Sequence, residues 1–143
     1  MHHRLSTQWG EGSSNRPEVS FPGGKKVDAQ IGEIMINTDQ AVSNGGDESA
    51  PEPFQLFLAS IATCAGIYAL SFCQSRNIPL DGMSLSMECD WDEDKKRYSK
   101  MSINLGLPEG FDEKYQKAVI RSMDLCSVKK HMMDPPEFEI TTY

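Results

Sequence analysis

The sequence predicts an α+β domain in which antiparallel strands surround one long apolar helix. Three observations support this fold class. Apolar residues alternate with polar ones over residues 18–39 and 83–107, an uncharged run of 23 residues covers 53–75, and an amphipathic run covers 113–132. A period of two residues indicates strands and a period near 3.6 indicates helices. Strands that precede and follow single helices in this order favour an α+β arrangement with mostly antiparallel pairing.

Length and composition limit the possible functions. The 143 residues fit a single domain, which we expect at 18–143, preceded by a flexible polar arm at 1–17. That arm has no apolar stretch typical of a secretory signal, so we expect a cytoplasmic protein. The net charge of −7 argues against nucleic-acid binding, which needs clustered Lys and Arg.

The first elements in the chain are short strands. Val27, Ala29 and Ile31 alternate with polar residues, and glycine turns interrupt the segment, so residues 18–39 predict two or three strands. A loop rich in Gly, Ser, Asp and Pro follows at 40–53. Pro53 suits the first turn of a helix, with Ser49 or Glu52 assisting its start.

We expect a helix from Pro53 to about Arg76. Its uncharged run at 53–75 is long enough that a membrane span must be considered. Polar residues within it and ordinary globular flanks argue against that alternative, and we expect no membrane contact. Because many of its residues are small, we expect it to be buried in a core or between subunits.

The second half of the chain predicts a hairpin and further helical turns. Two alternating runs, 83–91 and 101–107, flank a charged turn at 92–97 and predict an antiparallel hairpin with one wet face. Helical spacing then points Cys126 inward, and Ser127 starts a short further helix through Met133. We expect the last six residues, FEITTY, to form a strand.

Two of the four cysteines are candidates for chemistry. Cys64 lies in the long apolar run and Cys126 ends the amphipathic run, so the two thiols are either buried packing or a nucleophile with a resolving partner. At mid-helix, Cys64 is expected to gain nothing from a helix N-terminus, whereas Cys126 is followed by cations. We interpret Cys73 and Cys89 as packing. The residues alone leave the choice open.

Other common chemistries lack their motifs. The sequence has no CxxC or HxxxH pair, so no metal site is expected. It has no glycine-rich nucleotide motif and no GxSxG elbow, and we expect no cofactor.

Two segments resemble the OsmC/Ohr family of thiol-dependent organic hydroperoxide reductases. One is APEPFQLFLASIATCAG at 50–66, and the other is LCSVKKHM at 125–132. The resemblance implies an OsmC-like fold and an intertwined homodimer with its central helices in the middle. It also implies that Cys64 is the peroxidatic thiol, that Cys126 resolves it, and that an external dithiol reduces the pair without a cofactor.

The resemblance is incomplete around the first cysteine. The hydroperoxide-resistance branch has an activating Arg in its N-terminal strands and a Glu at the head of the central helix. Here the Glu position is Phe54, and residues 19–75 contain no arginine. Lys25 or Lys26 is therefore our candidate for the activating cation. Arg and Lys differ in geometry and in how readily they lose charge, so the chain is most similar to the less characterised OsmC-like branch.

We expect thiol-dependent reduction of a small organic hydroperoxide, in a pocket lined by Phe54, Gln55, Phe57 and Tyr68. Two alternatives stay open: a non-catalytic OsmC-like dimer that binds a small apolar ligand, and other cysteine-based sulfur chemistry.

Overall fold

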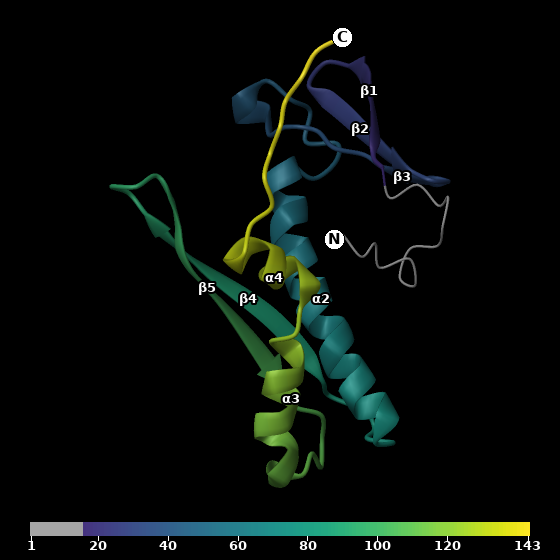
Figure 1. Cartoon of the computed structure of the whole chain (residues 1–143), viewed down its shortest axis with the longest axis vertical. Helices are drawn as coiled ribbons and strands as arrows, with labels where there is room; N and C mark the ends of the chain where they lie inside the picture. The colour runs from purple at the N-terminus through teal and green to yellow at the C-terminus, as the bar shows by residue number, and fades with distance from the viewer. Residues whose placement is uncertain (1–15) are drawn as a thin grey trace. The chain divides into compact units, whose positions relative to one another are not determined.

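A computed structural model describes residues 16–143 (Figure 1). The chain divides into an N-terminal unit, Met1–Phe57, and a C-terminal unit, Leu58–Tyr143. The boundary falls inside the long helix, and each unit is described by itself. The expected arm at 1–17 lies almost wholly outside the described residues.

The N-terminal unit contains a three-stranded antiparallel sheet. Its strands are β1 (Glu18–Gly23), β2 (Lys26–Ile31) and β3 (Ile34–Ile36), in the order β1-β2-β3. Ala29 of β2 pairs with a residue on each neighbouring strand. The positive φ angle of Gly24 lets the chain reverse tightly between β1 and β2. The alternation over residues 18–39 therefore predicted these strands correctly.

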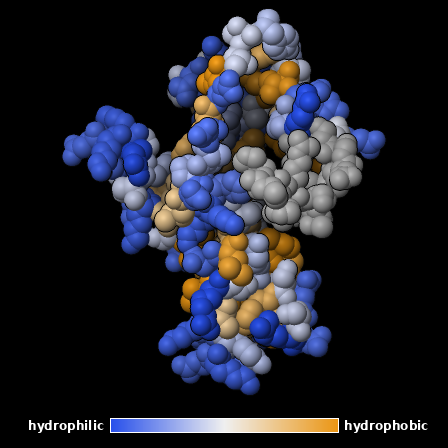
Figure 2. Space-filling model, viewed as in Figure 1, coloured by the Kyte–Doolittle hydropathy of each residue, from blue (hydrophilic) through white to orange (hydrophobic). Residues whose placement is uncertain are grey.

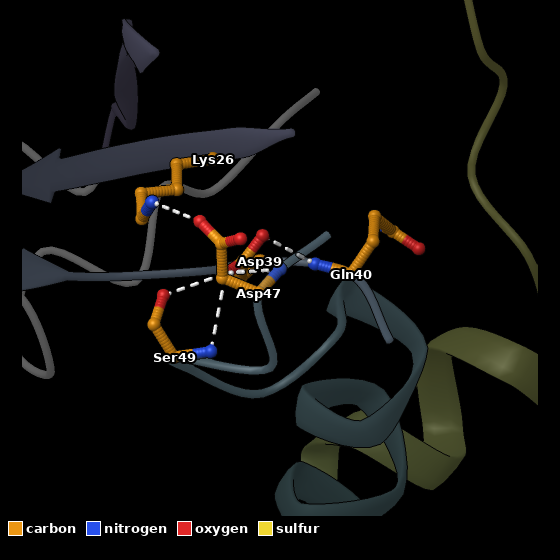
Figure 3. Close-up of polar contacts among 5 residues, drawn as sticks. All are labelled: Lys26, Asp39, Gln40, Asp47 and Ser49. Carbon is orange, nitrogen blue, oxygen red and sulfur yellow. Dashed lines mark hydrogen bonds and ion pairs between the residues drawn. The ribbon is translucent and has the colours of Figure 1, made fainter. Parts of the chain in front are cut away.

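A buried carboxylate organises the loop that follows the sheet (Figure 3). Asp39 is 1% exposed, and it accepts hydrogen bonds from the Ser49 hydroxyl at 2.6 Å and from the backbone N–H groups of Gln40, Ser49 and Asp47 at 2.8, 3.1 and 3.3 Å. The Ser49 hydrogen bond is the largest cause that holds the pKa of Asp39 well below its usual range. The loop carries the short 3₁₀ turn η1 (Val42–Asn44), and Asp39 connects its two ends through these hydrogen bonds.

The long helix α2 (Pro53–Ser75) has recognisable signals at both ends. Pro53 occupies its first position, and the side chain of Gln55 accepts the N–H of Glu52 at 2.9 Å, which is half of a capping box. Ser49 does not assist this start, because its hydroxyl binds Asp39. At the other end Asn77 has φ +54°, and Ile78 donates to the carbonyl of Cys73 at 2.9 Å, as in a Schellman motif.

One face of α2 is buried within the C-terminal unit. The buried residues recur at helical spacing: Ile61, Ala65, Ala69, Phe72 and Cys73. The opposite stripe is exposed and consists of Ala59, Thr63, Ile67, Ser71 and Gln74. By length and composition α2 is able to cross a membrane, a test that the core helix of a globular protein also passes.

The C-terminal unit also contains the expected hairpin. Strands β4 (Ser84–Asp92) and β5 (Arg97–Gly106) pair antiparallel, with Leu85 opposite Leu105 and Cys89 opposite Met101. The carboxylate of Asp92 accepts two backbone N–H groups of the turn, which fixes the reversal. Alternate residues of β4 are half-buried and exposed, which confirms the predicted wet face.

The helical run at 113–132 is interrupted. It consists of the 3₁₀ turn η2 (Glu113–Tyr115), α3 (Gln116–Met123) and α4 (Ser127–Met133), with Cys126 as the residue that precedes α4. A core forms where α3 meets α2, from Ala69, Phe72, Cys73 and Val119. Burial raises the pKa of Cys73, as expected for a packing thiol. Apolar residues also remain on the surface in the lower half of Figure 2, where α2 and α3 lie.

The prediction of a C-terminal strand was wrong. Residues 135–143 have no regular structure, and Phe138 and Ile140 are 86% and 97% exposed. A strand needs a neighbouring strand to accept its backbone hydrogen bonds, and no described strand pairs with this segment. Alternation in the sequence indicates only that a strand is possible.

A two-cysteine candidate active site

The fold brings Cys64 and Cys126 together. Cys64 lies in the middle of α2, and Cys126 directly precedes α4, which lies beside α2 (Figure 1). The Cys126 thiol is within hydrogen-bonding reach of the Cys64 sulfur, and both cysteines are free. Cys126 is 2% exposed, whereas Cys64 is half-buried. A molecule from solution therefore meets Cys64 more readily than Cys126 in this chain.

The start of α4 surrounds the Cys64 sulfur with hydrogen-bond donors. Burial raises the pKa of Cys64, but hydrogen bonds from the Cys126 thiol, the Val128 N–H, and the hydroxyl and N–H of Ser127 outweigh burial and lower it. The Ser127 Oγ atom lies 3.9 Å from the Cys64 Sγ atom. The expectation that Cys64 gains nothing from a helix N-terminus was wrong, because a different helix supplies these donors.

The pKa of Cys126 shifts in the opposite direction. Burial is the largest cause that raises the pKa of Cys126, and its hydrogen bond to Cys64 raises the pKa further. The backbone N–H groups of Lys129 and Val128 lower the pKa of Cys126, but by less than burial and Cys64 raise it. These opposite directions favour Cys64 over Cys126 as the thiol that carries negative charge.

Two of the basic residues that follow Cys126 in the sequence have partners of their own. The Lys129 ammonium donates to the carboxylate of Asp124, so its charge is offset locally. The Nδ1 atom of His131 lies 2.6 Å from the Ser127 carbonyl oxygen, within the turns of α4. Donors at the Cys64 sulfur are thus mostly thiol, hydroxyl and backbone groups.

An apolar cavity of about 590 Å³ adjoins Cys126. Besides Cys126, it is lined mainly by apolar side chains of α2, β5 and the α3–α4 segment, among them Ile61, Met101, Ile103, Leu105, Val119 and Met123. The polar side chains at the cavity include Gln116, Asp124 and Lys129. Such a lining suits a small apolar group more than a charged ligand.

The lysines expected near this pair belong to the other unit of the chain, which is described by itself. Lys25 and Lys26 belong to the N-terminal unit, where the Lys26 ammonium lies 3.0 Å from the carboxylate of Asp47 (Figure 3). That contact raises the pKa of Lys26. Activation of Cys64 by either lysine stays a prediction.

The expected substrate-pocket residues likewise stay a prediction. Phe54, Gln55 and Phe57 lie in the N-terminal unit, with the two phenyl rings 5.4 Å apart between centroids. Tyr68 lies one turn beyond Cys64, and its carbonyl accepts the Ser122 hydroxyl at 3.3 Å. Other residues line the 590 Å³ cavity.

The sequence analysis missed Ser127 and Val128 as donors to Cys64. Their position at the start of a predicted helix was the available signal, but spacing alone did not show that this helix end meets the middle of α2. Within residues 16–143, no three His, Cys, Asp or Glu side chains cluster in a way suited to a metal ion.

A family comparison identifies the chain. The family model described as OsmC-like protein matches residues 45–141, a span that contains both cysteines and both helices around them. The chain belongs to the OsmC-like family. No curated protein sequence matches it.

Solved structures share the OsmC-like fold. A protein from Psychrobacter arcticus 273-4, named for osmotic stress induction and a detoxification response, is 24% identical and has a TM-score of 0.67 over 80% of this chain and 85% of that one. The Legionella pneumophila organic hydroperoxide resistance protein OsmC is 20% identical, with a TM-score of 0.53 over 81% and 88%.

A further OsmC-like structure comes from Vibrio cholerae O1 biovar eltor. This protein, named for organic hydroperoxide resistance, has captopril bound in one of its active sites. It is 16% identical, with a TM-score of 0.53 over 81% of this chain and 83% of that one. These similarities support the α+β fold predicted from the sequence.

Proposed function

We propose that this OsmC-like protein is a thiol-dependent peroxidase that reduces organic hydroperoxides. The observation that carries the proposal is the contact between a half-buried Cys64, whose pKa is lowered, and a buried Cys126, whose pKa is raised. A nucleophilic thiolate next to a protonated resolving thiol is the arrangement that this chemistry needs.

The first step oxidises Cys64. Its thiolate attacks the terminal oxygen of the hydroperoxide ROOH, an S–O bond forms, and the O–O bond breaks. Cys64 becomes a sulfenic acid, and the leaving alkoxide takes a proton from solvent to give the alcohol ROH. Two electrons pass from sulfur to the peroxide in this step.

The second step uses Cys126. Its sulfur attacks the Cys64 sulfenic acid, and an S–S bond forms as the S–O bond breaks. The hydroxyl leaves as water with the Cys126 proton. An external dithiol then reduces the disulfide by exchange, so that both thiols return and the reductant becomes a disulfide.

The nature of the cavity favours an organic substrate. Apolar side chains line most of the 590 Å³ beside Cys126, and an alkyl or aryl group gains free energy when it leaves water for such a surface. Hydrogen peroxide has no apolar group that could be removed from water by contact with this lining. Two relatives of the same fold, from Legionella and Vibrio, are named for organic hydroperoxide resistance.

We also propose that the protein works as a homodimer in the cytoplasm. The exposed stripe of α2 contains small residues and Ile67, which is 52% exposed. The Thr63 hydroxyl in this stripe donates to the Ala59 carbonyl at 2.7 Å, so this polar group is satisfied within α2. Small residues allow two helices to approach closely, and a second α2 would cover the stripe. Lys25 or Lys26 remains our candidate for an additional cation at Cys64.

One observation favours a second candidate function. The apolar cavity is large enough for a small ligand irrespective of any thiol chemistry. A non-catalytic OsmC-like dimer would bind an apolar molecule there with its cysteines reduced throughout. In that case Cys64→Ser leaves ligand affinity intact, and no peroxide is consumed by the natural sequence.

Steady-state consumption of cumene hydroperoxide with dithiothreitol as reductant tests the proposal. We expect turnover by the natural sequence and a loss of at least about 1,000-fold in Cys64→Ser, because removing a covalent nucleophile leaves only binding. Cys89→Ser is the matched control, since Cys89 is half-buried on β4 opposite Met101. Equal turnover by all three proteins would exclude Cys64 as the nucleophile.

A further inference from the structure

We propose that Ser127 is a positioning residue for Cys64: its hydroxyl donates a hydrogen bond to the Cys64 sulfur and keeps negative charge there rather than on Cys126. The catalytic consequence rests on the proposed peroxidase function. The hydrogen bond itself does not, and it can be tested in the reduced protein without any peroxide.

The geometry supports a direct contact. Ser127 Oγ lies 3.9 Å from Cys64 Sγ, within the longer range that hydrogen bonds to sulfur allow, and the two residues come from different helices. Both side chains are half-buried, so the contact is partly shielded from water. A thiolate has no proton to give, so the Ser127 hydroxyl must be the donor once Cys64 ionises.

Ser127 distinguishes the two sulfurs. The backbone N–H of Val128 serves both cysteines, and the N–H of Lys129 serves Cys126. The hydroxyl and N–H of Ser127 act on Cys64. Because a hydrogen bond to a charged group is stronger than one to a neutral group, the hydroxyl favours the state in which Cys64 carries the charge.

The hydroxyl is not needed to start α4. Cys126 occupies the N-cap position of α4, and no side-chain capping hydrogen bond is made there. The contact that the structure gives the Ser127 hydroxyl is the Cys64 sulfur. Substitution at 127 therefore removes a group that acts on sulfur, and it leaves the cap of the helix as it was.

Three other titratable groups near Ser127 have contacts of their own. Cys126 contacts the Cys64 sulfur directly, and Lys129 is paired with Asp124. His131 contacts the Ser127 carbonyl through Nδ1, so its ring acts on the backbone of Ser127. These contacts are expected to be the same in two Ser127 variants whose side chains have the same shape as each other.

The decisive comparison is Ser127→Thr against Ser127→Val, which have nearly the same shape but differ in the hydroxyl. The pKa of Cys64 is measured in the reduced protein by iodoacetamide alkylation over a pH series, with site assignment by peptide mass spectrometry. We expect Thr to match the natural sequence and Val to raise the pKa by about half a unit to one unit. That shift corresponds to a roughly 3- to 10-fold slower alkylation of Cys64 below its pKa.

Ser122→Ala is the matched control. The Ser122 hydroxyl also reaches α2, but it donates to the Tyr68 carbonyl and not to a thiol. We expect no change in the pKa of Cys64 in this variant. The proposal is overturned if Val and Thr titrate alike, or if Ser122→Ala shifts Cys64 as much as Ser127→Val does. Ser127→Ala provides a smaller replacement if valine prevents folding.

The same proteins separate this inference from the proposed function. If Val and Thr differ in alkylation but the natural sequence consumes no cumene hydroperoxide, the hydrogen bond stands and the peroxidase proposal fails. If the natural sequence consumes peroxide and Val equals Thr in alkylation, the peroxidase proposal stands and the role of Ser127 fails.

Discussion

The thiol of Cys126 lies within hydrogen-bonding reach of the sulfur of Cys64, although the two residues are 62 positions apart in the sequence. The contact gives the two cysteines different environments, and the difference can be measured. Cys64 is half-buried and its pKa is lowered, whereas Cys126 is buried and its pKa is raised.

Replacing the resolving thiol is expected to stop the reaction halfway. In Cys126→Ser the first oxidation still occurs, but no disulfide forms, so a sulfenic acid accumulates on Cys64. Dimedone labelling with mass spectrometry measures it. We expect strong labelling of Cys64 in this variant after one equivalent of cumene hydroperoxide, and at least about tenfold less in the natural sequence. Equal labelling of the two proteins would show that Cys126 does not resolve Cys64.

The two cysteines are expected to react in different pH ranges. A free cysteine has a pKa of about 8.5. The pKa of Cys64 is lowered, so its thiolate persists at pH values below about 8.5 and is lost only as the pH falls through the lowered pKa. The pKa of Cys126 is raised, so its thiolate appears only above that value. Site-resolved alkylation between pH 5 and pH 10 should therefore give two separate curves. A single shared curve, or Cys126 reacting first, contradicts the assignment of roles.

Asp39 is expected to stabilise the loop before α2 in a pH-dependent way. Its folded pKa lies well below the unfolded value of about 3.9, so its contribution is complete above that value and is lost as the pH falls toward the folded pKa. Asp39→Asn should lower Tm by several degrees at pH 7, since a neutral amide leaves the loop N–H groups with a weaker acceptor.

Thermal unfolding followed by circular dichroism at pH 7 and pH 3 measures this effect. The gap in Tm between the natural sequence and Asp39→Asn should narrow at pH 3. Asp47→Asn is the control, because Asp47 is largely exposed and its ion pair with Lys26 should contribute little. A gap that does not change with pH would mean that the charge of Asp39 is not what stabilises the loop.

The exposed stripe of α2 predicts a dimer. Sedimentation at micromolar concentration should give about twice the 16.0 kDa of one chain. Ile67→Glu places a charge in the stripe, and burying an unpaired charge is costly. We therefore expect the dissociation constant of the dimer to rise at least about tenfold in this variant. Ser86→Glu, on the wet face of β4, is the matched control. A natural sequence that sediments as a monomer contradicts the prediction.

The sequence predicted an element correctly where its pattern is compatible with one structure only. Strict alternation gave the β4–β5 hairpin, because a slip of one residue would expose its apolar face. Pro53 and Asn77 mark the ends of α2 closely, since a proline at the first position and a left-handed residue after the last turn are local signals. The pairing of Cys64 with Cys126 came from family resemblance rather than from spacing.

Features that depend on contacts between distant segments were missed. The donors that α4 supplies to Cys64 follow from how α4 meets α2, which no local pattern encodes. The convergence of the 39–49 loop on Asp39 is likewise a property of the folded loop. The expected strand at the C-terminus failed because alternation cannot supply a partner strand.

Peptide mapping of the reduced protein after one equivalent of cumene hydroperoxide tests the central claim most directly. The account predicts that Cys64 and Cys126 are recovered as one disulfide-linked peptide pair, while Cys73 and Cys89 remain reduced. Recovery of Cys64 as a free thiol after this treatment would contradict it.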